Sequence, residues 1–130
     1  MTEFNNQKIL AIDFGTKRIG LAISHGPLAQ PLTIVHYQEE DQAVAKIAEV
    51  CFQQQITKII LGISEKETAV KTRRFGKKLQ SKISLPVIYF DETLSSKEVE
   101  ERLKLRKKPL PKEIDDYAAA YILEQWLEDN

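Results

Sequence analysis

Residues 9–24 read ILAIDFGTKRIGLAIS, in which two apolar runs flank a turn of three residues. Branched apolar side chains in both runs are typical of buried strands, and the short connection leaves room only for a tight turn. The two runs are therefore predicted to form an antiparallel hairpin. The first run ends on a charged residue, Asp13. Burying a carboxylate at the end of a strand costs free energy unless a partner compensates its charge.

The remaining sequence predicts a single mixed sheet flanked by helices. Three more apolar runs are typical of strands, and they cover residues 31–37, 58–63 and 85–90. Four segments show helical spacing or helix-start signals, namely residues 39–55, 66–82, 95–104 and 113–129. Asp41 is the expected N-cap of the first helix. This order predicts an α/β fold: a three-stranded antiparallel meander plus two parallel strands, in one domain over residues 1–130.

Three features indicate a cytoplasmic protein without a membrane partner. No apolar run approaches the roughly 20 residues that a membrane span requires. The first eight residues, MTEFNNQK, lack the basic and apolar regions of a signal peptide. The single cysteine, Cys51, falls in a helical pattern, and we expect it to be a core residue in a reducing compartment.

The charges are balanced overall but unevenly distributed. The chain has 19 Lys and Arg and 19 Asp and Glu, and residues 57–112 hold 15 of the basic side chains against 7 of the acidic ones. Such a segment suits a phosphate-rich partner, although the charges alone favour the simpler explanation, a set of solvated helix surfaces. The basic side chains that we expect to contact nucleic acid are Lys71, Arg73, Arg74, Lys107 and Lys108.

Carboxylates occur where the predicted elements should meet. Asp13 ends the first strand, and Glu92 follows the fifth strand at the same edge of the sheet. The closing helix begins with Asp115 and Asp116, and its periodicity allows either of them to face the sheet beside the alanines at 118–120. Three oxygen ligands of this kind favour Mg²⁺ or Mn²⁺ over zinc.

A cluster of acids around two such ions can hydrolyse a phosphodiester bond, because one ion activates water and the other stabilises the leaving oxygen. Thr16 and Lys17, in the turn beside Asp13, are suited to holding a phosphate group. Ordinary roles remain open: Asp13 can accept turn hydrogen bonds, and Asp115 and Asp116 can be first-turn acids of a helix. The pattern predicts a metal-dependent nuclease, with a non-catalytic nucleic-acid-binding module as the alternative.

The segments AIDFGTKRIGLA, DETLSS and IDDYAAAYILEQWL, in this order, resemble three blocks of the YqgF/RuvX family. The resemblance implies an RNase H-like fold and processing of the 5′ end of pre-16S rRNA during ribosome biogenesis. A Holliday-junction resolvase type of endonuclease is the alternative within that family. The third block favours Asp115 over Asp116, so that the catalytic and metal-binding residues implied by the resemblance are Asp13, Glu92 and Asp115.

Two departures from the family pattern lie next to these residues. Thr93 stands where the family usually has Arg, and residues 62–71 lack the usual Gly-Leu-Pro and the glycine of the following loop. We expect these departures to alter substrate binding or to weaken catalysis. Glu65, just after the fourth strand, is an additional candidate metal ligand. The oligomeric state stays open, because a homodimer suits paired cuts in a junction and a monomer suits rRNA trimming.

Overall fold

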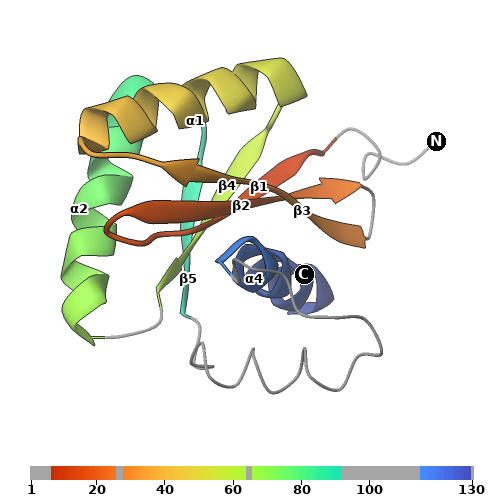
Figure 1. Cartoon of the computed structure of the whole chain (residues 1–130). Helices are drawn as coiled ribbons and strands as arrows, with labels where there is room; N and C mark the ends of the chain where they lie inside the picture. Colours follow the sequence, from red (N-terminus) through yellow and green to blue (C-terminus); the bar gives the residue numbers. More distant parts are fainter. Residues whose placement is uncertain (1–6, 26–27, 64–65, 92–114, 130) are drawn as a thin grey trace.

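The computed structural model describes residues 7–25, 28–63, 66–91 and 115–129 (Figure 1). Its elements are β1 (Ile9–Asp13), β2 (Arg18–His25), β3 (Leu28–His36), α1 (Glu40–Gln54), β4 (Lys58–Ile63), α2 (Lys66–Lys82), β5 (Val87–Asp91) and α4 (Asp115–Asp129). The five strands form one sheet in the order β3-β2-β1-β4-β5. The meander β1–β2–β3 is antiparallel, whereas β1, β4 and β5 are parallel, which confirms the predicted mixed sheet. The helix predicted over 95–104 lies outside the described residues.

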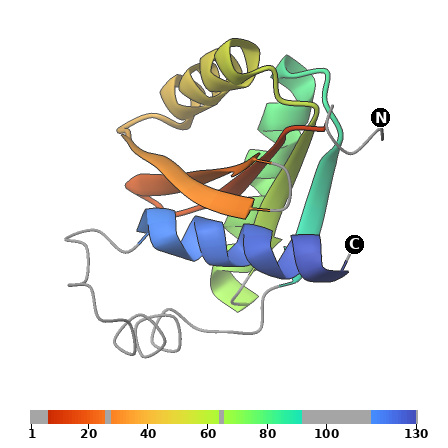
Figure 2. The ribbon, with the colours of Figure 1, turned by 90° about the vertical axis from the view of Figure 1, so that its right-hand side faces the viewer.

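The helices cover both faces of the sheet. Helices α1 and α2 pack on one face and α4 crosses the other, as Figures 1 and 2 show. Strand alternation divides β1 accordingly: Leu10 and Ile12 belong to the core under α1 and α2, and Ile9 and Ala11 belong to the core under α4. Because both of its faces are covered, β1 is apolar along almost its whole length, as the sequence pattern indicated.

The third strand begins earlier than the sequence indicated. β3 starts at Leu28, which pairs with His25, instead of starting at Pro31. Proline lacks the N–H that a central strand would need, but β3 lies at the edge of the sheet and Pro31 sits next to a register shift opposite Leu21 and Ala22. The predicted start was wrong because a proline that an edge strand tolerates was taken for a strand boundary.

Helix α1 begins at Glu40, and its N-cap is Glu39, so the predicted cap at Asp41 was wrong. The Glu39 N–H donates to the Gln42 side chain at 3.4 Å, which helps to satisfy the start of the helix. Cys51 is buried in the core, as predicted, and burial raises the pKa of its thiol to about 11. Among the described helices, none combines the length and apolar character that crossing a membrane requires.

Candidate functional site

Asp13 is the last residue of β1 and lies between two glycines. It pairs with Gly20 of β2 on one side and with Gly62 of β4 on the other. Alternation along β1 places it on the face that α4 covers, and it is half-buried there. A Cβ at Gly62 would lie 2.5 Å from the Cδ1 of Ile122 in α4, so Ile122 would have to shift to make room for it. The partner of Asp13 on the other side, Gly20, is buried and adds no side chain next to the carboxylate.

The parallel strands end together near Asp13. Gly62 pairs with Phe90 of β5, and the next pair is Ile63 with Asp91. The carboxyl ends of β1, β4 and β5 therefore meet at one edge of the sheet, which is where open α/β sheets place their reactive sites. The sequence predicted this convergence from the strand order. Glu92, the acid expected at the end of the fifth strand, lies outside the described residues.

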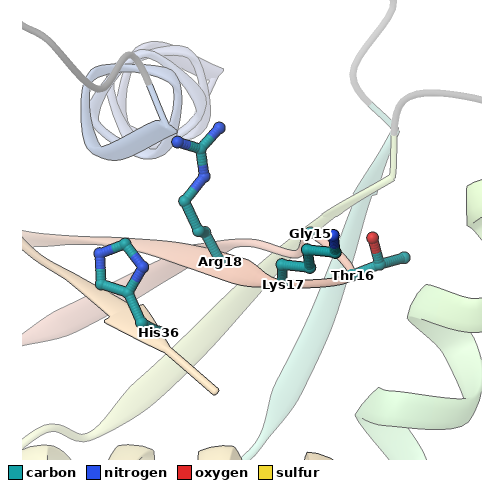
Figure 3. Close-up of a pocket in the computed structure, with 5 residues that line it drawn as sticks. All are labelled: Gly15, Thr16, Lys17, Arg18 and His36. Atoms are coloured by element: carbon teal, nitrogen blue, oxygen red, sulfur yellow. The ribbon is translucent and has the colours of Figure 1, made fainter. Parts of the chain in front are cut away.

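The first turn of α4 approaches the same region. α4 begins at Asp115, and its Ala119, Ile122 and Leu123 are buried against the sheet. Arg18, the first residue of β2, extends toward the start of this helix, as Figure 3 shows. The helix that carries the predicted third ligand thus begins close to the turn that follows Asp13, although the Asp115 side chain is not among those described.

The turn between β1 and β2 is fixed by aromatic side chains. The Tyr37 hydroxyl donates to the carbonyl of Gly15 at 2.6 Å, and the Tyr37 N–H donates to the carbonyl of Lys17 at 3.2 Å. Phe14 packs on Phe75 of α2, with 4.7 Å between the ring centroids. These contacts hold both ends of the turn, so its backbone is a defined surface. Sequence reasoning missed Tyr37, because nothing in its neighbourhood shows that it reaches a turn 20 residues away.

Tyr37→Phe is expected to lower the free energy of unfolding by about 1 kcal/mol near pH 7, because it removes the hydrogen bond to Gly15. Burial, and after it the charge of Glu40, raises the pKa of Tyr37 above the usual 10.0. A group with a raised pKa contributes its full stability below its unfolded pKa and loses it as the pH rises through the folded pKa. Urea unfolding of the wild type should therefore show a loss of stability above about pH 10 that is smaller in Tyr37→Phe. An identical loss in both proteins would contradict this role for the phenol.

An open hollow of about 510 Å³ lies beside the turn (Figure 3). Its lining is formed by Gly15, Thr16, Lys17, Arg18 and His36. The structure thus brings the predicted phosphate contacts Thr16 and Lys17 together on one exposed surface. Only the pairing of β2 with β3 places His36 next to the turn and beside Arg18, and the sequence alone does not show this proximity.

The basic side chains predicted on α2 are exposed, but on the sheet face opposite to α4. Arg74 lies 3.9 Å from Glu40 of α1, and Lys78 lies 3.3 Å from the same carboxylate. The guanidinium of Arg73 lies 5.3 Å from the centre of the Tyr89 ring. Helix α1 therefore offsets part of the positive charge of α2, and Lys71 and Arg73 have no acidic partner in the ion pairs described. Lys107 and Lys108 lie outside the described residues.

Among the described side chains, no group of three or more His, Cys, Asp or Glu residues lies close enough together to hold a metal ion. Of the three acids expected to share an ion, only Asp13 has a described side chain. The grouping of Asp13, Glu92 and Asp115 consequently stays a prediction.

Comparison with known proteins gives a consistent picture at the sequence level. Residues 7–129 match the family model described as RuvX, Holliday junction resolvase. A curated protein of Chloroflexus aurantiacus named "Putative pre-16S rRNA nuclease" is 33% identical, over 95% of this chain and 88% of its own length. A protein of Maridesulfovibrio salexigens with the same name is 34% identical, over 92% of this chain and 97% of its own.

Solved structures show the same fold. Thermus thermophilus RuvC in complex with a Holliday junction substrate aligns with a TM-score of 0.62 and 17% identity, covering 95% of this chain and 94% of that one. The Fowlpox virus resolvase with Holliday junction DNA also aligns with a TM-score of 0.62, at 16% identity over 95% of this chain and 98% of that one. At these identities the likeness shows the architecture, which is the RNase H-like fold.

Proposed function

The chain belongs to the RuvX family, and we propose that it is a metal-dependent nuclease that hydrolyses phosphodiester bonds of structured nucleic acid. The specific substrate that we propose is pre-16S rRNA, whose 5′ end it would process during ribosome biogenesis in the cytoplasm. One observation carries the proposal: Asp13 ends β1 between two glycines, at the edge where β4 and β5 also end, beside a hollow lined by Lys17 and Arg18. A carboxylate with cationic surroundings is the arrangement that a metal-dependent nuclease needs to hold a polyanion.

Asp13, Glu92 and Asp115 are the residues that would hold Mg²⁺ or Mn²⁺. The Asp13 carboxylate is a hard oxygen donor at the end of β1, and its strand partner Gly20 adds no side chain beside it. Asp13 pairs with Gly62, Gly62 pairs with Phe90, and Glu92 follows Phe90 by two residues in the sequence. Asp115 is the first residue of α4, the helix that covers this face of the sheet. When bound, such ions activate the attacking water and stabilise the leaving oxygen.

The chain's own residues would position the substrate. The Thr16 hydroxyl and the Lys17 ammonium can donate to phosphate oxygens, and the Tyr37 hydrogen bond keeps their backbone in place. Lys71, Arg73 and Arg74 of α2, with Lys107 and Lys108, would contact more distant phosphates. Contacts of this kind position a nucleic-acid backbone without reading its sequence.

Resolution of branched DNA is a second candidate function, because the matching family model is described as a Holliday junction resolvase. Two matched cuts in a junction require two sites, so this function would need a homodimer, whereas a monomer suffices for rRNA trimming.

The test is cleavage by the full chain of an RNA that spans the 5′ precursor boundary of 16S rRNA, and of a four-way DNA junction. Each substrate is labelled and incubated with EDTA, Mg²⁺ or Mn²⁺. We expect cleavage of the RNA with either ion and none with EDTA, and an RNA that starts at the mature 5′ end serves as the matched control. Cleavage of the junction alone would favour the resolvase. Binding without cleavage of either substrate would contradict the nuclease and leave a nucleic-acid-binding module.

A further inference from the structure

Two cationic or hydrogen-bond-donating side chains outside the expected catalytic set share the hollow beside the turn. Arg18 is the first residue of β2, His36 is the last residue of β3, and both are exposed. They are directly paired in the register of the two strands, so they are cross-strand neighbours. We propose that Arg18 and His36 together form a binding site for a backbone phosphate of the nucleic acid, next to the phosphate that is cleaved.

Strand alternation places both side chains on the same face as Asp13. Their neighbours Ile19 and Val35 are buried in the core under α1 and α2, so residues 18 and 36 project on the opposite side. Figure 3 shows the two side chains rising from adjacent strands on one side of the sheet, with Arg18 directed toward the start of α4. Gly20, the partner of Asp13, is two residues from Arg18, which corresponds to about 7 Å along the strand. The site would therefore hold a phosphate that flanks the one at Asp13.

The chemistry of the pair suits a phosphate group. Arginine presents a planar fork of N–H donors that matches two phosphate oxygens, and an imidazole N–H supplies a further donor. Among the described residues, those that line the hollow include Lys17 and no carboxylate. A ligand with negative oxygens is thus favoured over a cation or an apolar molecule.

The site is held by regular structure. Arg18 and His36 terminate paired strands, and the next residue after His36, Tyr37, bonds to Gly15 and Lys17 on the other side of the hollow. The backbone positions of the two residues are therefore fixed before a ligand arrives, which lowers the ordering cost of binding. The basic helix α2 lies on the other face of the sheet, so these two residues would hold the nucleic-acid backbone next to Asp13 on the side of β2 and β3, and α2 would be reached only by more distant phosphates.

This inference rests on the proposed nuclease function, and its test separates the two. Binding of fluorescein-labelled RNA and of DNA with the same sequence is measured by anisotropy between 50 and 200 mM salt, in an Asp13→Asn background that prevents cleavage. The double variant Arg18→Gln with His36→Gln should weaken binding about tenfold. The slope of log affinity against log salt concentration should also fall by about the amount expected for one phosphate contact. Arg18→Lys should lose less affinity, because it keeps the positive charge and loses only the planar set of guanidinium N–H donors. The matched control is Lys46→Ala, which removes an exposed cation on α1.

In steady-state cleavage, without the Asp13 substitution, the double variant should raise KM about tenfold and change kcat by less than about threefold. An affinity and a salt dependence equal to those of Lys46→Ala would overturn the phosphate site while a cleaving wild type keeps the nuclease. A wild type that neither binds nor cleaves would overturn both. Equal weakening with RNA and DNA is expected, and weakening with RNA alone would point to a contact with the ribose and overturn the assignment to phosphate.

Discussion

Asp13→Asn is expected to reduce cleavage by about 1,000-fold at saturating Mg²⁺, which corresponds to about 4 kcal/mol in the activation barrier. The amide has nearly the shape of the carboxylate, so the pairing of β1 with Gly20 and Gly62 should remain. The substitution removes the negative charge that a divalent ion requires. The measurement is the single-turnover cleavage rate of the RNA substrate, together with the urea-unfolding midpoint as a check on the fold.

The matched control for this variant is Asp41→Asn, because Asp41 is a carboxylate of α1 whose side chain is 90% exposed. The control should cleave at a rate within about twofold of the wild type, since surface substitutions of this kind have small effects. Wild-type cleavage by Asp13→Asn would show that the acid at the end of β1 has no catalytic role. Tighter RNA binding by Asp13→Asn is also expected, because a repulsive charge near the phosphates is removed.

Phe75→Ala is expected to lower the free energy of unfolding by about 3–5 kcal/mol, the usual loss for truncating a fully buried aromatic ring. Phe75 is 0% exposed in α2 and packs on Phe14, the residue after Asp13. Its loss should leave a cavity between α2 and the sheet. The measurement is urea unfolding followed by circular dichroism at constant pH.

Phe52→Ala provides the control with the same change of side chain. Phe52 is 86% exposed on α1, so that variant should stay within about 0.5 kcal/mol of the wild type. Phe75→Leu, which keeps most of the volume, should be less destabilised than Phe75→Ala. Equal losses at Phe75 and Phe52 would mean that the core under α2 is not packed as described.

The sequence predicted the sheet well because its strongest signals are local. The apolar runs around Asp13 and at 58–63 follow from burial on both faces, and a three-residue connection permits only a hairpin. The errors occurred at boundaries, where several residues satisfy the same rule. Glu39 and Asp41 are both acids able to start α1, and only the backbone geometry distinguishes them.

Candidate site residues were predictable where they follow a strand and were missed where they depend on contacts between strands. Asp13 stood out because a charge at the end of a buried run is costly without a partner. His36 had no such signal, since its proximity to Arg18 results from the β2–β3 register. The ion pair of Glu40 with Lys78 was hidden for the same reason, because it depends on how α1 packs on α2.

The position of α4 has a consequence for how the molecule assembles over time. The Ile122 side chain lies against Gly62 of β4. Helix α4 also packs on the meander β1–β2–β3, so the last helix of the chain covers strands from the first third of the sequence. Pairing between neighbouring strands closes short loops and is fast, whereas docking a helix from about 100 residues away closes a long one and is slow. The two hairpins should accordingly form early, and the surface around Asp13 should be completed in the last folding step.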